Sequence, residues 1–203
     1  MAGITALFWD VGGVLLTNGW DRHSRQRAAE RFKLDWEDFE DRHELVVGRF
    51  ETGRLSLDHY LERTIFYRPR DYGKDEFKAY MFAQSKAIKG TLEVVGRLAR
   101  TGRYLMATLN NESRELNLYR IERFGLPRYF SIFMTSSFLG VKKPEDEVFH
   151  LALDLSQRKA EDCLFIDDRE LNVECAVRCG LRALHFKNAA QLEQDLRNAG
   201  LEL

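Results

Sequence analysis

The stretch Ile4-Thr5-Ala6-Leu7-Phe8-Trp9-Asp10-Val11-Gly12-Gly13 decides the fold of this 203-residue chain. Its first six residues form a short and almost wholly apolar run, and a carboxylate and two glycines follow that run closely. A run of this kind is typical of a strand that is covered on both faces of a sheet. Four more runs of similar length and composition occur further along the chain: Tyr104–Leu109, Ser131–Thr135, Cys163–Ile166 and Arg182–Phe186.

Helical patterns separate these predicted strands. Glycines close three of them, as glycine often does at a helix C-terminus, and Asn110 or Asn111 is expected to cap the start of the second. The regular alternation of strand and helix predicts right-handed crossovers and a mostly parallel sheet, hence an α/β fold with a doubly wound, Rossmann-like core. The predicted helices are Leu92–Arg100, Glu112–Phe124, Glu145–Leu155 and Leu171–Cys179.

Residues 18–88 break this alternation. They place aromatic and charged residues at helical spacing and contain no convincing strand. Residues 51–56 indicate a helix end, a turn and a new helix that Ser56 caps. The sequence therefore predicts a helical cap domain over residues 18–88, inserted into a core domain made of residues 1–17 and 89–203.

The composition is that of an ordinary globular protein. With 31% charged residues and a net charge of −1, the chain lacks the basic excess of a nucleic-acid binder, so no nucleic-acid partner is expected. No apolar run approaches the roughly 20 residues of a membrane span, and the first run lacks the basic flank of a signal peptide. Only three cysteines are present, and Cys175 and Cys179 are expected to be buried, inert thiols. A cytoplasmic protein without a membrane partner is the expectation.

Polar side chains follow the predicted strands at their carboxyl ends, where open parallel sheets bind ligands. Carboxylates held about 4 Å apart repel each other by several kcal/mol even at an effective dielectric constant of 20, so a cation is expected between them. Oxygen ligands of this type suit Mg²⁺, and a lysine ammonium would draw an anionic phosphoryl group to the carboxylates. The residues in question are Asp10, Asn110, Asn111, Lys142, Lys143, Asp167 and Asp168.

The order of these segments resembles the four motifs of the haloacid dehalogenase (HAD) superfamily. Phe8–Leu15 is similar to the first motif, Leu109–Asn111 to the second, Val141–Pro144 to the lysine motif and Phe165–Asp168 to the acidic fourth motif. The helical insertion lies where this family carries a small cap.

The resemblance implies a role for each matching residue. Asp10 would be the nucleophile that forms an aspartyl intermediate, and Lys143 would steer the phosphate, with Asn110 and Asn111 binding its remaining oxygens. Asp10, Asp168 and the backbone carbonyl of Gly12 would hold Mg²⁺. Asp167 and Asn172 would support the site, and the substrate would be a small phosphorylated metabolite.

Two residues depart from the family pattern. Gly12 stands where the family's phosphatases usually carry a second aspartate that acts as general acid and base, and Asn110 stands where Ser or Thr is usual. The sequence therefore predicts a phosphatase but leaves two alternatives open. One is a 2-haloacid dehalogenase that uses the same aspartate without a metal, and the other is a catalytically silent phosphate-binding protein. Specificity is expected from the cap, for which Arg49 and Arg54 are candidates.

Overall fold

A computed structural model describes residues 3–203, so Met1 and Ala2 of the predicted core segment lie outside the described residues. Its centre is a five-stranded sheet in the order β3-β2-β1-β4-β5, in which every neighbouring pair is parallel. The predicted α/β fold and all five predicted strands are confirmed, with boundaries that differ by at most two residues. The strands are β1 (Ala6–Trp9), β2 (Leu105–Asn110), β3 (Ile132–Thr135), β4 (Cys163–Asp167) and β5 (Arg182–His185).

The chain reverses its direction of travel across the sheet at β1. From β1 it moves outward through β2 to β3, and it then returns to the other side of β1 to form β4 and β5. The carboxyl ends of β1, β2 and β4 therefore meet at the point where ligands bind in doubly wound sheets.

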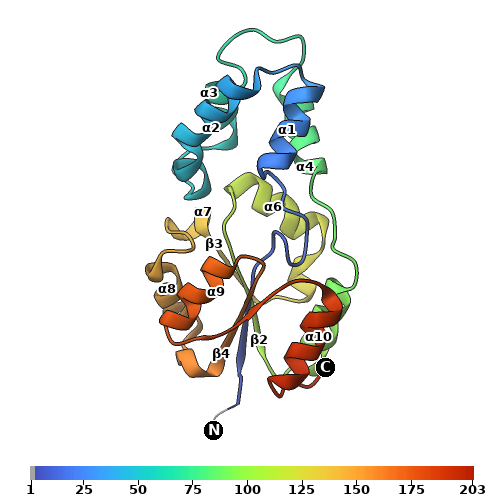
Figure 1. The fold of residues 1–203 in the computed structure, drawn as a ribbon, viewed down its shortest axis with the longest axis vertical. Coiled ribbons are helices and arrows are strands. Elements are labelled where there is room, and N and C mark those ends of the chain that lie inside the picture. Colours follow the sequence, from blue (N-terminus) through green and yellow to red (C-terminus); the bar gives the residue numbers. More distant parts are fainter. Residues whose placement is uncertain (1–2) are drawn as a thin grey trace.

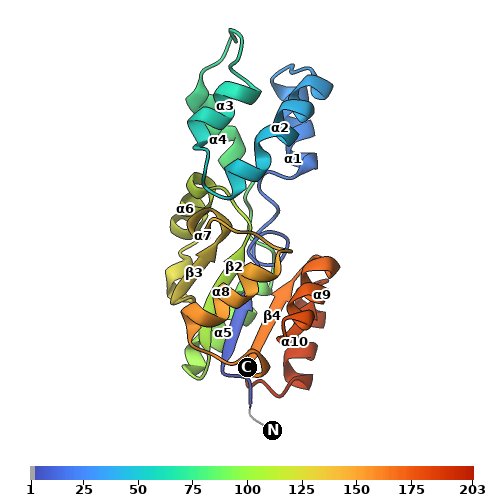
Figure 2. The same cartoon turned by 90° about the vertical axis from the view of Figure 1, so that its left-hand side faces the viewer.

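Helices cover both faces of the sheet, as Figures 1 and 2 show. Leu7 and Trp9 of β1 face a cluster built with α5 (Thr91–Thr101) and α10 (Ala189–Asn198). Ala6 and Phe8 face the opposite cluster, built with α8 (Asp146–Ser156) and α9 (Glu170–Arg178). All four strand residues are fully buried, which explains why β1 lacks the alternation of a half-exposed strand. The shorter elements are α7 (Ser136–Leu139), η1 (Leu126–Arg128) and η2 (Ala160–Asp162).

The start of α6 (Arg114–Arg123) corrects one sequence-based expectation. The cap position of this helix belongs to Ser113, two or three residues after the predicted asparagines. Asn110 is the last residue of β2, and the side chain of Asn111 hydrogen-bonds the backbone of Lys143 instead of a helix N–H group. Neither asparagine caps the helix, because Asn110 still belongs to β2 and the amide of Asn111 is bonded to Lys143.

Four helices form the cap above the sheet: α1 (Arg22–Arg31), α2 (Trp36–Glu51), α3 (Leu57–Thr64) and α4 (Lys74–Ala83) (Figure 1). Their buried aromatic and aliphatic side chains make a hydrophobic cluster of their own, centred on rings such as Phe39 and Phe77. Ser56 caps α3 as predicted, since its hydroxyl accepts a hydrogen bond from the backbone N–H of His59. The division into independent domains at residues 17/18 and 88/89 stays a prediction.

Two adjacent chain segments connect the cap to the core. The N–H of Thr17 donates to the carbonyl of Lys86 at 2.8 Å, and Leu16 forms an antiparallel bridge with Ala87. Arg120 of α6 ties both segments to the core, because it donates to the carbonyl of Thr17 and to the hydroxyl of Ser85, each at 3.0 Å. No helix within residues 3–203 is both long and apolar enough to cross a membrane.

Candidate active site

Three carboxylates gather at the carboxyl end of the sheet. Asp10 directly follows β1 and donates its backbone N–H to Ile166 at 2.9 Å, while Asp167 ends β4 and Asp168 follows it. One oxygen from each of the three lies within 4.8 Å of the others. The structure thus brings together the carboxylates of the first and fourth sequence motifs, as the topology predicts.

A single buried lysine offsets part of this negative charge. The Lys143 ammonium lies 3.0 Å from Asp10 Oδ1 and 2.5 Å from Asp167 Oδ2, and the residue is 3% exposed. Burial alone would lower the pKa of Lys143, but Asp10 and Asp167 outweigh it and raise that pKa above its usual value. Burial raises the pKa of Asp10 to about 7, although Lys143 opposes the shift. Arg169 also lowers the pKa of Asp168, but Lys143 and Arg169 together still leave the three carboxylates with fewer positive charges than negative ones.

Asp167 and Asp168 differ in what they contact. Asp167 is fully buried and accepts hydrogen bonds from the backbone N–H of Arg169 and from the amide of Asn172, besides its contact with Lys143. Among residues 3–203, no group hydrogen-bonds the buried Asp168 Oδ1, and burial followed by the charge of Asp167 raises the pKa of Asp168. A buried oxygen without a partner, next to two more carboxylates, fits the hard-oxygen coordination that Mg²⁺ prefers.

The two asparagines of the second motif have different positions. Asn111 lines the cavity in front of Asp10, and its amide holds the backbone of Lys143 by two hydrogen bonds, of 2.7 and 2.9 Å. Asn110 is 2% exposed, is not part of the cavity wall, and bonds Asn117 and Thr135. The predicted phosphate contact is thus geometrically accessible to Asn111, whereas the side chain of Asn110 belongs to the packing beneath the site.

The cavity in front of Asp10 has a volume of about 530 Å³ and lies between the core and the cap. One face of α2 forms much of its wall through residues at helical spacing: Glu40, His43, Glu44, Val47, Phe50 and Glu51. The sequence predicted specificity from polar residues of the cap such as Arg49 and Arg54, but these two are exposed and neither lines the cavity. The spacing of the α2 residues was the signal that could have found the correct face.

Lys142 connects the cap to the core. Its ammonium lies 2.8 Å from Glu51 Oε2 at the end of α2, and both side chains are about one-third exposed. Lys142 therefore faces the cap side of the cavity, whereas Lys143, the next residue, faces the carboxylates. The two adjacent lysines have separate environments.

The two glycines that follow Asp10 differ in how strongly the structure requires glycine at their positions. Gly13 has a φ of +78°, and a Cβ there would lie 2.1 Å from Asp168 Oδ2, so only glycine lets the backbone approach this carboxylate. Gly12 has no such φ. A Cβ at Gly12 would meet Asn18 Oδ1 at 2.7 Å, which is the movable end of a side chain, and Arg120 Nη1 at 3.8 Å.

A buried ion pair lies beside Gly12 that the sequence did not suggest. Arg120 Nη1 lies 2.9 Å from Glu112 Oε2, with the arginine side chain 2% exposed and the glutamate side chain 11% exposed. Both residues line the cavity together with Asp10 and Gly12. Burial raises the pKa of Glu112, against the lowering effect of Arg120.

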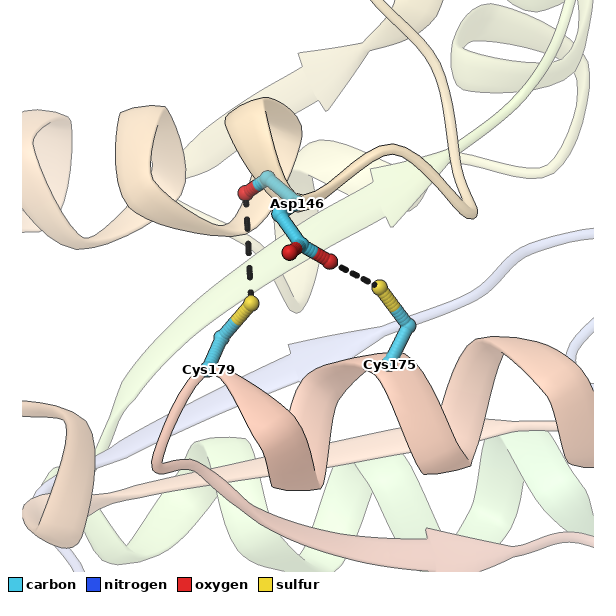
Figure 3. A group of neighbouring side chains, drawn as sticks. All are labelled: Asp146, Cys175 and Cys179. Atoms are coloured by element: carbon cyan, nitrogen blue, oxygen red, sulfur yellow. Dashed lines mark hydrogen bonds between the residues drawn. The ribbon is translucent and has the colours of Figure 1, made fainter.

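Asp146, Cys175 and Cys179 form a second cluster (Figure 3), which contacts the loop of residues 140–145 at Pro144. The Cys175 thiol donates to Asp146 Oδ1 and to the carbonyl of Pro144, each at 2.8 Å. Burial, reinforced by Asp146, raises the pKa of Cys175 to about 12, so this thiol stays protonated. Through its bond to the Pro144 carbonyl, Cys175 supports the backbone beside Lys143.

This fold and this set of residues are those of the haloacid dehalogenase-like hydrolases. The model of that family matches residues 4–180, and the chain belongs to the family. The match spans all four motifs and the helical cap, so the resemblance in the sequence is confirmed.

Three similar proteins are informative. The chain is 29% identical over 164 residues to flavin mononucleotide hydrolase 1 of Arabidopsis thaliana. The aligned segment covers 81% of this chain and 66% of the plant protein. It is 28% identical over 116 residues to the glyceraldehyde 3-phosphate phosphatase of Pyrococcus furiosus, covering 57% of this chain and 48% of that enzyme. A HAD family enzyme of Bacteroides thetaiotaomicron has the same fold, with a TM-score of 0.81 at 20% identity over 97% of this chain and 100% of that one.

The different surroundings of the two glycines lead to a first prediction. We expect Gly13→Ala to lower the free energy of unfolding by about 1–3 kcal/mol, because it forces a Cβ into a left-handed conformation and against Asp168. Gly12→Ala is the matched control and should cost less, since only the Asn18 side chain has to move. Thermal or urea unfolding of the two variants measures this difference, and equal losses would contradict it.

Proposed function

We propose that the protein is a magnesium-dependent phosphomonoesterase that acts through an aspartyl-phosphate at Asp10. The observation that carries the proposal is the meeting of Asp10, Lys143 and Asp168 at one end of the sheet, where Asp10 and Lys143 border a cavity and Asp168 Oδ1 has no hydrogen-bond partner among the described residues. A carboxylate beside a buried ammonium suits attack on a phosphoryl group, since the ammonium attracts the anionic substrate that the carboxylates alone would repel.

Each residue has a separate part in this reaction. Asp10 Oδ attacks phosphorus and forms the new P–O bond while the bond to the leaving oxygen breaks. Lys143 stabilises the negative charge on the phosphoryl oxygens and holds Asp10 in place, and Asn111 fixes the backbone of Lys143. Asp10, Asp168 and the carbonyl of Gly12 would hold Mg²⁺, which supplies electrophilic stabilisation of those oxygens. Asp167 and Asn172 keep Lys143 and the end of β4 in position.

A phosphate substrate is favoured over a haloacid. The three carboxylates outnumber the single ammonium, so the site benefits from a metal cation, and metal-assisted chemistry goes with phosphoryl transfer. The two relatives named above are a flavin mononucleotide hydrolase and a glyceraldehyde 3-phosphate phosphatase, both of which act on small phosphorylated compounds. The Bacteroides enzyme was also solved as a complex with magnesium and inorganic phosphate. These names support the substrate class, a small organic phosphate.

The cap supplies the wall that such a compound would meet. Trp20, His43 and Phe50 line the cavity beside the paired charges of Arg25 and Glu40. Burial, and then the charge of Arg25, lowers the pKa of His43 to about 3, so this imidazole is neutral at physiological pH and available for hydrogen bonding. A mixed aromatic and polar wall fits an organic group larger than inorganic phosphate.

The direct test is a screen of phosphorylated metabolites together with one aryl phosphate, performed with Mg²⁺ and with a chelator. We expect Mg²⁺-dependent release of phosphate, and we expect Asp10→Asn to lose it almost completely, because the amide has the size of the carboxylate but no nucleophilic charge. Cleavage of a 2-haloacid in the presence of chelator would favour the dehalogenase alternative. Binding of phosphate without any turnover would favour the silent alternative.

Lys143 and Lys142 provide a matched pair of variants. We expect Lys143→Ala to lower kcat/KM by on the order of 10²–10³, the range seen when a charge-stabilising group is removed from an active site. Lys142→Ala should change it much less, because this side chain is partly exposed and pairs with Glu51 of the cap. Steady-state kinetics on the aryl phosphate measures both effects. A larger loss for Lys142→Ala would contradict the assignment of the lysine.

A further inference from the structure

We propose that Glu112, held by Arg120, is the general acid and base that this site uses in place of the aspartate missing at Gly12. The inference rests on the proposed phosphatase function and extends it to the leaving group. It starts from a chemical requirement. An alkoxide that leaves phosphorus needs a proton, and the water that later attacks the phosphoaspartate must lose one. Between these two steps Asp10 carries the phosphoryl group and cannot transfer a proton, and Gly12 has no side chain that could do so.

Arg120 lies close both to Glu112 and to the position that a side chain of residue 12 would take. The direction in which a Cβ would leave Gly12 brings it to 3.8 Å from Arg120 Nη1, and the same nitrogen lies 2.9 Å from Glu112 Oε2. A carboxylate at residue 12 and the carboxylate of Glu112 would therefore border one guanidinium nitrogen. Glu112 also lines the cavity with Asp10 and Gly12, and this cavity is the space in which the leaving group must lie.

The carboxyl group of Glu112 is fixed rather than free. Its Oε1 accepts hydrogen bonds from the backbone N–H and the hydroxyl of Ser113, at 2.9 and 3.3 Å, and its backbone N–H donates to Ser136 at 3.0 Å. Arg120 is itself anchored to Ser85 and Thr17, so the pair cannot swing away together. Such fixation is what a proton donor needs to act on a defined leaving oxygen.

The charged surroundings of Glu112 suit proton exchange. Burial raises its pKa, while Arg120 lowers it and Glu51 raises it further. The raised pKa favours the protonated carboxyl group, compared with that of an exposed glutamate, and the first step requires this acid form. Arg120 then stabilises the carboxylate that remains after the proton has left.

The two steps balance in atoms and protons. In the first, Asp10 Oδ forms a bond to phosphorus, the bond between phosphorus and the leaving oxygen breaks, and Glu112 gives its proton to that oxygen to release the alcohol. In the second, the Glu112 carboxylate takes a proton from a water molecule as the water oxygen attacks phosphorus. The P–O bond to Asp10 breaks, phosphate is released, and Glu112 is protonated again. The overall reaction is hydrolysis of the monoester.

The test compares an alkyl phosphate, glycerol phosphate, with an aryl phosphate, p-nitrophenyl phosphate, whose leaving group needs little protonation. We expect Glu112→Gln to lower kcat for the alkyl substrate by on the order of 10²–10⁴. It should lower the rate of formation of the phosphoenzyme from the aryl substrate by less than about tenfold, which also shows that the variant is folded. Glu122→Gln, an exposed glutamate on α6, is the matched control.

Two further variants distinguish an acid from a merely structural residue. Glu112→Asp keeps the carboxyl group and should retain more alkyl phosphatase activity than Glu112→Gln. Adding Gly12→Asp to Glu112→Gln should restore alkyl turnover, because it places a carboxyl group beside Arg120. Equal losses in the rate of phosphoenzyme formation from both substrates, or no rescue of alkyl turnover in a folded double variant, would overturn this inference alone. A natural protein without turnover of either phosphate would overturn the proposed function and this inference with it.

Discussion

The site depends on the crowding of three carboxylates around one buried lysine. Asp10, Asp167 and Asp168 each present an oxygen within 4.8 Å of the others, and Lys143 contacts only the first two. Burial first, and then the neighbouring carboxylates, raise the pKa values of Asp10 and Asp168, while Lys143 opposes both shifts. The parallel sheet matters because only the meeting of β1 and β4 at adjacent positions brings these carboxylates together against their repulsion.

The cap and the core are joined beside the candidate active site. Arg120 holds both connecting segments, at Thr17 and Ser85, and at the same time contacts Glu112 beside Gly12. Lys142 and Glu51 make a second contact across the cavity. A change in the position of the cap would therefore move Glu112, the residue that we propose as the proton donor to the leaving group. The absence of a side chain at Gly12 leaves room for this arrangement, since Asn18 and Arg120 border the space instead.

The parts of the fold that follow from local pattern were predictable from the sequence. The apolar run before Asp10 and the one before Asp167 are strands because their side chains are buried on both faces, and parallel topology then places their ends together. Long-range packing was not predictable in the same way. Asn110 bonds Asn117 and Thr135 beneath the site, and Glu112, which precedes α6, meets Arg120 on that helix. Which side chain faces the cavity depends on contacts that one sequence pattern does not contain.

The central claim is that Asp10 carries the phosphoryl group during turnover. The most direct measurement is to quench the reaction of the natural protein with an aryl phosphate in acid, digest it and locate the phosphoryl group by mass spectrometry. Our account predicts a phosphorylated peptide that contains Asp10, formed in the presence of Mg²⁺ and absent from the Asp10→Asn variant. Turnover that proceeds with the phosphoryl group on another residue, or with none on the protein at any time point, would contradict it.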